Sequence, residues 1–335
     1  MRIAVIGAGY WGPNLIRNLY ETRACSEIIC CDLDSKKLQK IKDRYPAVQT
    51  ESQYKRILGR KDVEAAVVAT PVSTHFPLGK EILEAGKHVF IEKPMTASPE
   101  EALELLHLSE KMNRVLMVGH TFEYSPPVIK IKELIDKGEL GKIYYISASR
   151  VNLGLHQKDV SVIWDLAPHD FSTLFYWLGE QPSRVSAIGK ACVQRKIPDV
   201  AFINLEFPSG CIAHVQVSWL APSKLRRTAV VGSRKMLVYD DTENIEKVKI
   251  YDKGVNYVDP ESFGQYQLSY RTGDVVSPRL ETYEPLFMEM KHFIECCREN
   301  KKPRTDGQSG LRVVRTLDAA ERSMRNNSIV VEIPA

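Results

Sequence analysis

The sequence predicts an α/β protein in two parts: a doubly wound parallel sheet, then an α+β part with a large, mostly antiparallel open sheet. The first 120 residues alternate continuous apolar runs with amphipathic helical segments, which is typical of a parallel sheet covered on both faces. From residue 140 onward, alternating strand-like segments joined by short turns indicate antiparallel pairing. We therefore divide the chain into domains at 1–121 and 122–335.

In the first part, the predicted strands alternate with segments that have helical periodicity. The helix at Pro99–Met112 has Ser98 as its N-cap and Glu101 three residues later, which is the capping-box pattern. Ligands of such sheets bind at the carboxyl ends of the strands. The predicted strands are Arg2–Ile6, Glu27–Cys31, Ala65–Ala69, His88–Ile91 and Val115–Val118, and the other helices are Ser35–Tyr45 and Thr74–Ala85.

The second part contains short strands, three helical segments and one stretch without periodicity. The stretch Val255–Pro278, rich in Gly, Ser, Tyr and Pro, is interpreted as a long loop or insertion. Strands are expected at 143–151, 185–193, 200–207, 211–219, 228–231 and 235–239, helices at 171–178, 284–299 and 310–324, and a last apolar stretch at 329–331.

Composition limits the class of protein. The 335 residues are 44% hydrophobic and 26% charged, so a sizeable core can form. The net charge is only +4 and the basic residues are scattered, which argues against a nucleic-acid surface. Seven cysteines include no C-x-x-C pair, so we expect neither a zinc site nor a disulfide framework. No apolar run approaches membrane-spanning length, and we expect a cytoplasmic protein.

A glycine motif follows the first predicted strand. Such a turn lets backbone approach a pyrophosphate at the positive end of a helix. Asp32 ends the second strand, twenty positions after the last glycine of the motif, where a carboxylate should contact an adenosine ribose. This combination predicts a Rossmann dinucleotide site, with an ordinary βαβ turn as the plainer alternative. The motif residues are Gly7, Gly9, Tyr10, Trp11 and Gly12.

Asp32 also bears on which dinucleotide binds. A carboxylate accepts hydrogen bonds from ribose hydroxyls and repels a 2′-phosphate, and no arginine follows directly. We therefore expect NAD rather than NADP. Lys36 and Lys37 leave NADP open, although a solvated helix turn is the plainer interpretation for both.

Glu92, Lys93 and Pro94 follow the predicted strand His88–Ile91, where a dinucleotide would cross the sheet. Pro94 biases Lys93 toward an extended backbone. The ammonium group could stabilise a developing alkoxide or donate to a substrate oxygen. A surface lysine in a loop is the alternative.

Asp165 and His169 form a D-x-x-x-H pair that shares one face of a helix. Because Pro168 is tolerated only in a first turn, we expect the helix to begin close to this pair. A histidine near a carboxylate suits proton transfer near neutral pH. The structural alternatives are an N-cap for Asp165 and a capping or core histidine for His169.

These motifs occur in one order, and the chain resembles the glucose–fructose oxidoreductase/inositol dehydrogenase (Gfo/Idh/MocA) family over nearly its whole length. The resemblance implies a Rossmann domain, then a domain whose open sheet often forms the oligomer interface, so we expect a homodimer or homotetramer. Carried over, Lys93, Asp165 and His169 match the family's catalytic residues. Thr70, Pro71, His75 and Glu92 match positions that approach the nicotinamide half of the cofactor.

Two stretches depart from the common family pattern. Tyr124-Ser125-Pro126 replaces Y-N-P, and Val162-Ile163-Trp164 replaces a glycine-rich approach to the D-x-x-x-H helix. The stretch from Arg150 to Gly154, with the later Trp164–Asp170, is similar to a branch that oxidises C3 of UDP-N-acetylglucosamine-type sugars. Arg150, Asn152 and Trp164 are therefore candidate substrate residues, with a strand-end salt bridge as the alternative for Arg150.

The expected reaction is hydride transfer between NAD and a secondary alcohol of a sugar or nucleotide sugar. His169 takes the hydroxyl proton, Lys93 orients the hydroxyl, and Asp165 positions the substrate; lysine and histidine could exchange roles. No metal is implied, since Lys93 supplies the cation. The alternatives are an NADP-dependent ketosugar reductase, an inositol or free-sugar dehydrogenase, and a non-catalytic dinucleotide-sensing protein.

Overall fold

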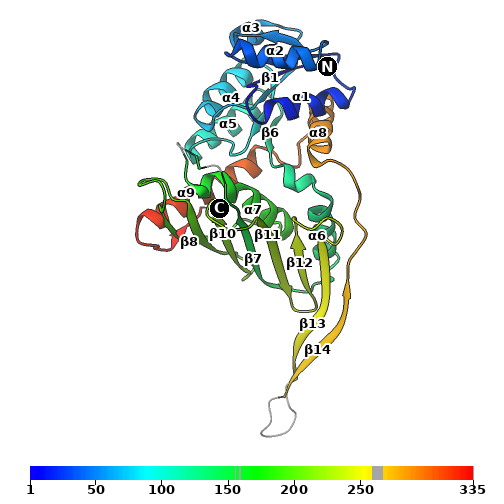
Figure 1. Ribbon diagram of the computed structural model, residues 1–335, viewed down its shortest axis with the longest axis vertical. Helices are drawn as coiled ribbons and strands as arrows, with labels where there is room; N and C mark the ends of the chain where they lie inside the picture. Colours follow the sequence, from blue (N-terminus) through cyan, green and yellow to red (C-terminus); the bar gives the residue numbers. More distant parts are fainter. Residues whose placement is uncertain (155, 158–159, 259–266, 335) are drawn as a thin grey trace. The chain divides into compact units, whose positions relative to one another are not determined.

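The computed structural model describes residues 1–154, 156–157, 160–258 and 267–334, and Figure 1 shows the arrangement of the helices and strands. The chain divides into two compact units. The first comprises Met1–Ser125 and Tyr283–Asp318, and the second Pro126–Thr282 and Ala319–Ala335. The boundary at Asp318 falls within a helix, α9, which spans Gly307–Arg325.

The first unit is built on a six-stranded parallel sheet with the order β3-β2-β1-β4-β5-β6, the strand order of a Rossmann fold. The central strands β1, β4, β5 and β6 are almost entirely buried because helices cover both faces, as the continuous apolar runs predict. The elements of the sheet region are β1 Arg2–Ile6, α1 Gly12–Glu21, β2 Glu27–Cys31, α2 Ser35–Arg44, β3 Gln49–Glu51, α3 Tyr54–Gly59, β4 Ala65–Val68, η1 Val72–Thr74, α4 His75–Glu84, β5 His88–Glu92, α5 Pro99–Lys111, β6 Leu116–Gly119 and η2 Thr121–Tyr124.

The first unit also includes a segment from the far end of the sequence. Helix α8, Pro285–Glu299, packs against α1 and η2. Phe293 of this helix meets Phe90 of β5 edge to face, and Glu284 pairs with Arg17 of α1. The division at residue 121 assigned this segment to the second domain, whereas its contacts group it with the first. An amphipathic pattern predicts a helix but carries no information about which sheet the helix covers.

The second unit holds a nine-stranded sheet in the order β14-β13-β12-β11-β7-β10-β9-β8-β15, in which only the β7–β10 pair is parallel. Helix α7 packs on β7, β9 and β10. Its elements are α6 Pro126–Asp136, β7 Ile143–Val151, α7 Val162–Leu178, β8 Arg184–Lys190, β9 Val200–Glu206, β10 Ile212–Ser218, β11 Leu225–Gly232, β12 Met236–Asp240, β13 Val248–Val258, β14 Gln267–Val276 and β15 Val331–Glu332.

The other face of this sheet is open. Side chains that alternate with the buried ones stay exposed there, among them Tyr145, Ile188, Phe202 and Ile212. Assembly of two or four copies through this face stays a prediction.

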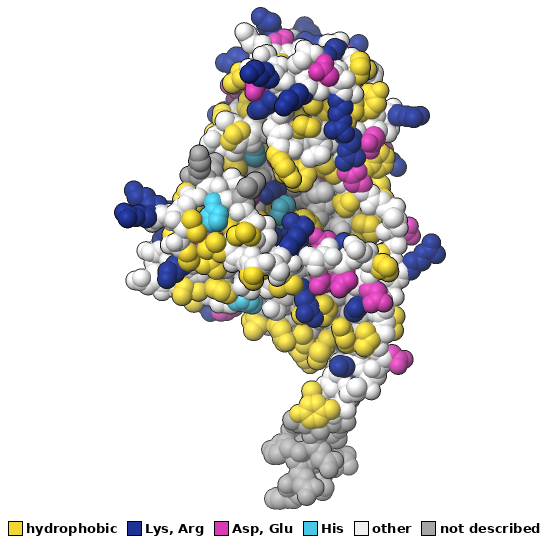
Figure 2. Space-filling model, in the orientation of Figure 1, with side chains coloured by type: hydrophobic (Ala, Val, Ile, Leu, Met, Phe, Trp, Pro, Cys, Tyr) yellow, Lys and Arg dark blue, Asp and Glu magenta, His cyan; other side chains and the backbone are white. Residues whose placement is uncertain are grey.

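On the surface seen in Figure 2, basic and acidic side chains are interspersed. Within the described ranges, no helix combines the length and apolar character needed to cross a bilayer.

The prediction of a loop over Val255–Pro278 is wrong for the part that the structure describes. Strands β13 and β14 pair antiparallel from Ile250 with Val276 to Val258 with Gln267, and Figure 1 shows them as a long ribbon at one end of the sheet. Residues 259–266 lie outside the described residues. Val255 and Tyr270 are exposed, and no described side chain from Tyr270 to Val276 is buried, so this part of the ribbon imposes no alternating pattern on the sequence.

The start of α7 also differs from the prediction. The helix begins at Val162 after Ser161, so Pro168 lies inside the helix rather than in its first turn. A proline there removes the bond to the carbonyl of Trp164. The apolar face of the helix offsets this loss, since Val162, Ile163 and Phe171 are fully buried. Asp165 still occupies the first turn, and His169 follows one turn later.

Candidate functional site

The glycine motif forms a tight turn between β1 and α1. Gly7 has φ +101°, and a Cβ on it would lie 2.4 Å from the Ala69 carbonyl oxygen. A Cβ on Gly12 would lie 2.0 Å from the Gly7 carbonyl oxygen, so helix and turn touch backbone to backbone. Nothing lies within 4 Å of a Cβ on Gly9. Gly7 thus packs against the chain after β4, Gly12 packs against Gly7, and the turn leaves open space at Gly9, as a pyrophosphate cradle requires.

Tyr10 and Trp11 extend from this turn into solvent. Their rings meet edge to face at 5.6 Å, and Tyr10 is 84% exposed. Leu33, beside Asp32, is 91% exposed. Apolar side chains held out of the core at the mouth of a glycine turn provide surface for a planar ligand group.

Asp32 holds the glycine turn from the end of β2. Its carboxylate accepts hydrogen bonds from the Ala8 N–H at 2.7 Å and the Asp34 N–H at 2.9 Å, and Lys37 lies 3.6 Å away. Burial alone would raise the pKa of Asp32, but these donors outweigh burial and hold the pKa below its ordinary value. The carboxylate is thus ionised and adjacent to the turn, as ribose recognition requires.

His75 joins the loops that follow β4 and β5. Its ring nitrogens lie 2.9 Å from the carbonyl oxygens of Pro94 and Thr70, and the side chain is buried. Burial lowers the pKa of His75, and Lys93 acts in the same direction. The ring therefore positions both loops; a direct contact of His75 with a cofactor stays a prediction. Thr70 packs against Gly7, while Pro71 beside it is exposed.

Glu92 and Lys93 end β5 as predicted, and the Lys93–Pro94 peptide bond is cis. The Glu92 carboxyl group lies over Gly119 of β6, where a Cβ would be 3.1 Å from its Oε2. Burial raises the pKa of Glu92 to about 7, although the ammonium of Lys93 opposes the rise. Lys93 itself is half-buried at the same edge of the sheet.

His120 directly follows β6 and lies at the same edge of the sheet as Glu92. Both ring nitrogens are buried and have no hydrogen-bond partner among the described residues. Burial, with a contribution from Lys93, lowers the pKa of His120 to about 3, so the ring is neutral. A buried, unpaired imidazole is costly unless another polar group completes it.

The carboxyl ends of the parallel strands carry the groups that a dinucleotide needs. The open position at Gly9 suits the phosphates, the ionised Asp32 suits ribose hydroxyls, and the unpaired nitrogens of His120 offer polar partners near Glu92 and Lys93. The residues present therefore fit the group that the fold implies.

A second buried acid supports this edge from α8. Glu289 is fully buried, and its Oε2 accepts a hydrogen bond from the Thr121 hydroxyl at 2.6 Å. Burial raises its pKa well above the ordinary value, and the nearby Glu92 and Glu123 act in the same direction. Sequence reasoning missed Glu289, because its partners lie more than a hundred residues earlier in the chain.

In the second unit, α7 carries Asp165 and His169 on successive turns. Asp165 accepts a hydrogen bond from the indole N–H of Trp219 at 2.9 Å. The His169 carbonyl accepts from the hydroxyls of Ser172 and Thr173, at 3.2 and 2.8 Å. Trp164 precedes the pair in the first turn and is half-buried.

Arg150 is engaged within the core of the second unit. Its guanidinium makes two hydrogen bonds to Asp170, at 2.8 and 3.1 Å, and both side chains are buried. Burial alone would lower the pKa of Arg150, but Asp170 reverses this and raises it. The structure favours the salt-bridge alternative over the predicted substrate contact, because the buried guanidinium of Arg150 already binds the Asp170 carboxylate.

Asn152 follows β7 and is half-buried. Its backbone N–H donates to the Ser218 carbonyl at 3.1 Å, so it lies beside the end of β10. Asn152 is thus bonded to the residue before Trp219, which contacts Asp165. A substrate contact of the Asn152 side chain stays a prediction.

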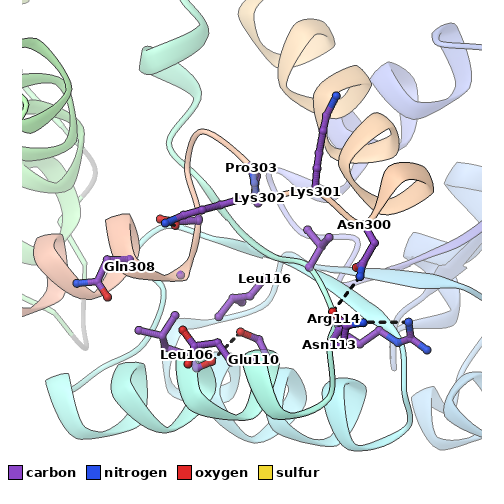
Figure 3. A pocket seen from close by; sticks show the side chains of 14 residues that line it. Leu106, Glu110, Asn113, Arg114, Leu116, Asn300, Lys301, Lys302, Pro303 and Gln308 are labelled. Atoms are coloured by element: carbon purple, nitrogen blue, oxygen red, sulfur yellow. Dashed lines mark hydrogen bonds and ion pairs between the residues drawn. The ribbon is translucent and has the colours of Figure 1, made fainter.

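A cavity of about 270 Å³ in the first unit lies elsewhere. Figure 3 shows it between the end of α5, the start of β6 and the chain entering α9. Its lining mixes both signs of charge: Lys302 pairs with Asp306 at 2.8 Å, and Lys301 pairs with Glu299. It adjoins the amino end of β6, opposite to the edge that carries Glu92 and His120.

The fold and this edge define an NAD-binding oxidoreductase. Residues 1–120 match the model of an oxidoreductase family with an NAD-binding Rossmann fold, and residues 128–238 match the GFO/IDH/MocA C-terminal domain. The chain belongs to the Gfo/Idh/MocA family of NAD-binding oxidoreductases.

Named relatives support the same assignment. The uncharacterized oxidoreductase YdgJ of Escherichia coli is 32% identical over 243 residues, covering 70% of this chain and 69% of that protein. UDP-N-acetylglucosamine 3-dehydrogenase of Acidithiobacillus ferrooxidans is 29% identical over 198 residues, covering 59% and 61%. The crystal structure of GenD2 from gentamicin A biosynthesis, in complex with NAD, superposes with a TM-score of 0.82 at 21% identity, covering 100% of this chain and 97% of that one.

Proposed function

We propose that this enzyme oxidises the C3 hydroxyl of a UDP-N-acetylglucosamine-type nucleotide sugar, with NAD as the acceptor. The proposal rests on two features: Lys93 directly follows β5 in the first unit, and Asp165 and His169 share one face of α7 in the second unit. The likeness to a UDP-N-acetylglucosamine 3-dehydrogenase supports the choice of sugar.

NAD, when bound, supplies the nicotinamide ring that accepts the hydride from the sugar carbon. In the proposed step, His169 accepts the proton of the sugar hydroxyl as the carbonyl forms. Lys93 orients the hydroxyl and stabilises the negative charge on its oxygen. Asp165 orients the substrate and the imidazole. The sugar loses one hydride and one proton and becomes a ketone, so electrons and atoms balance.

The first unit supplies the binding groups for the cofactor. Asp32 would hold the ribose hydroxyls, and the N–H groups after Gly9, at the start of α1, would bind the phosphates. Glu92, with a pKa of about 7, and the neutral His120 would offer polar groups to the cofactor without adding a second cation beside Lys93.

A substrate panel tests the proposal. The protein is mixed with NAD or NADP and with UDP-N-acetylglucosamine, UDP-glucose or myo-inositol, and formation of reduced cofactor is followed by absorbance. We expect the highest kcat/KM with UDP-N-acetylglucosamine and a preference for NAD. Activity confined to myo-inositol, or a preference for NADP, would contradict the proposal.

The catalytic assignment has its own test. His169→Ala should lower kcat by about 10²- to 10⁴-fold, because a positioned general base contributes this much. The dissociation constant for NAD, measured by fluorescence, should stay unchanged. Near-normal turnover of this variant would remove His169 from the proposed step.

A further inference from the structure

A buried tryptophan contacts the candidate catalytic carboxylate. The indole N–H of Trp219 donates to the Asp165 carboxylate oxygen Oδ2 at 2.9 Å, across 54 residues of sequence. Trp219 is only 1% exposed, so water competes little for this hydrogen bond. Tryptophan offers one N–H and no acceptor, which makes the contact directional.

The backbone fixes Trp219 on both sides. It follows β10, its N–H donates to the Asp199 carbonyl at 2.9 Å, and its own carbonyl accepts from the Gly154 N–H at 3.0 Å. A Cβ on Gly154 would lie 3.0 Å from the indole Cδ1, so the absence of a side chain there makes room for the ring. The ring of His156 lies 5.4 Å from the indole. The indole is therefore held in one orientation.

Trp219 thereby connects two features that the sequence showed separately. The stretch Arg150–Gly154 and the segment Trp164–Asp170 are the two stretches that resemble the nucleotide-sugar branch of the family. Gly154 seats the indole, and the indole holds Asp165 in the first turn of α7, one turn before His169.

We propose that Trp219 is a positioning residue for the reaction. Its N–H holds the Asp165 carboxylate in one plane, so that Asp165 presents a fixed oxygen geometry to the substrate and to His169. This inference rests on the proposed function, because it assigns Trp219 a role through Asp165. Trp219 itself touches neither substrate nor cofactor in this step.

The chain offers a matched control. Trp177 is also 1% exposed and lies in the same unit, and its indole N–H donates to the Val128 carbonyl at 2.9 Å. Trp219→Phe and Trp177→Phe each remove one buried indole N–H bond and a similar volume. They differ in the acceptor: a carboxylate of the candidate site in one case and a backbone carbonyl of α6 in the other.

We expect Trp219→Phe to lower kcat by about 10- to 100-fold, the effect of losing one hydrogen bond to a charged group. The dissociation constant for NAD should not change, and the loss of thermal stability should equal that of Trp177→Phe. Trp177→Phe should keep kcat within about twofold of the wild type. Equal kcat in both variants would overturn the inference.

A double-mutant cycle separates positioning from structure. If Trp219 acts through Asp165, then Trp219→Phe should have no further effect on kcat in an Asp165→Ala background. Multiplying effects would show that Trp219 acts independently and would overturn the inference. Full activity of Asp165→Ala alone would instead contradict the catalytic assignment in the proposed function, so the two failures can be told apart.

Discussion

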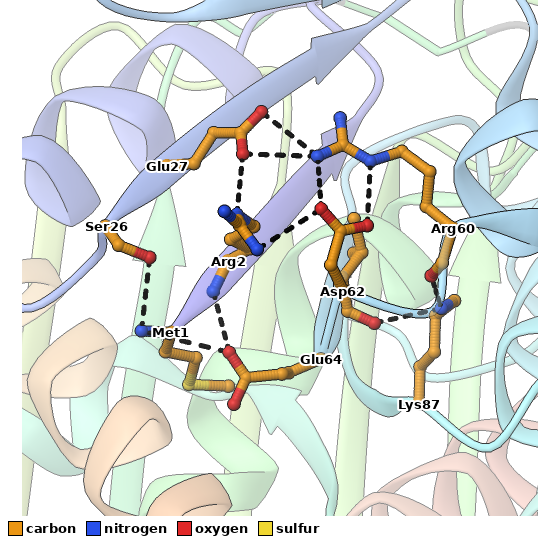
Figure 4. A network of polar contacts seen from close by, with 9 residues as sticks. Met1, Arg2, Ser26, Glu27, Arg60, Asp62, Glu64 and Lys87 are labelled. Atoms are coloured by element: carbon orange, nitrogen blue, oxygen red, sulfur yellow. Dashed lines mark hydrogen bonds and ion pairs between the residues drawn. The ribbon is translucent and has the colours of Figure 1, made fainter.

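The two edges of the parallel sheet in the first unit are built from similar strands but hold their polar residues differently. At the amino ends, charged side chains neutralise one another (Figure 4). Arg2 pairs with Glu27 at 2.8 Å and with Asp62 at 3.3 Å, and Arg60 donates to the same two acids. Lys87 is buried and donates to the carbonyls of Arg60 and Val63.

At the carboxyl ends, Asp32 pairs with Lys37, but other polar groups are left incomplete. Gly9 faces open space, burial raises the pKa of Glu92 to about 7, and the ring nitrogens of His120 have no partner among the described residues. The comparison shows that charged residues alone do not identify the edge of the sheet that binds a ligand. Buried polar groups that the fold leaves incomplete are the better mark, since they cost stability unless a ligand completes them.

The largest expected effect contrasts the two lysines that flank β5. Lys93→Met should lower kcat/KM by about 10²- to 10⁴-fold with little change in stability, because it removes the cation beside the reacting oxygen. Lys87→Met should do the reverse, lowering the free energy of unfolding by about 1–3 kcal/mol while kcat stays near the wild-type value, because two buried carbonyls lose their donor. Steady-state kinetics and urea unfolding measure both. A kinetic defect in Lys87→Met as large as that in Lys93→Met would break the comparison.

The next effect concerns two glycines that both have room for a Cβ. Neither Gly9 nor Gly59 has an atom within 4 Å of a Cβ position, so alanine should fit the free protein at both. Gly9→Ala should raise the dissociation constant for NAD at least about tenfold, because a Cβ would occupy the space that the phosphates approach. Gly59→Ala, at the end of α3, should leave it unchanged. Titration of each variant with NAD, followed by fluorescence, measures the two dissociation constants. Equal values for Gly9→Ala and Gly59→Ala would mean that the phosphates do not bind at Gly9.

The pH dependence of stability sharpens the comparison further. Burial raises the pKa of Glu92 to about 7 in the folded protein, so its protonated form favours folding. That contribution is fully present below the ordinary value of 4.5 and is lost as pH rises through about 7. Between about pH 5 and pH 8, wild-type protein should therefore lose more stability than Glu92→Gln, measured by unfolding at each pH.

Asp32→Asn is the control for this measurement. The pKa of Asp32 is lowered, so its contribution is complete above the ordinary value of 3.8 and is lost only as pH falls through the lower native value. The variant should keep the wild-type slope at neutral pH. A Glu92→Gln variant with that same slope would mean that Glu92 does not titrate in this range.

The smallest effect is expected from the amino-edge network. Asp62 is 42% exposed, and exposed ion pairs add little to stability because water and salt screen them. Asp62→Asn should shift Tm by no more than about 2 °C. The affinity for NAD should stay the same; a weakened affinity would show that the two edges are coupled.

Local patterns predicted the parallel sheet and its glycine turn, because continuous buried strands and the spacing from Gly12 to Asp32 are local features. The short strand β3 escaped prediction, since two of its three residues are exposed. The ribbon of β13 and β14 was mistaken for a loop, since no described side chain from Tyr270 to Val276 is buried.

The candidate site was predictable where neighbours in sequence carry it and not where distant residues meet. Lys93, Asp165 and His169 were identified from short motifs. The pairing of Arg150 with Asp170, the contact of Trp219 with Asp165 and the support of Thr121 by Glu289 depend on tertiary packing. Spacing along the chain carries no record of these pairs.

Amide hydrogen exchange with and without NAD tests most directly whether the cofactor binds at the carboxyl ends of the parallel strands. We predict that NAD slows exchange at residues 7–12, 69–75 and 92–95, where the turn and the loops after β4 and β5 meet the cofactor. Exchange at 26–27, 60–64 and 113–116, at the amino ends and beside the cavity, should not change. Protection confined to those amino-end segments would contradict the account.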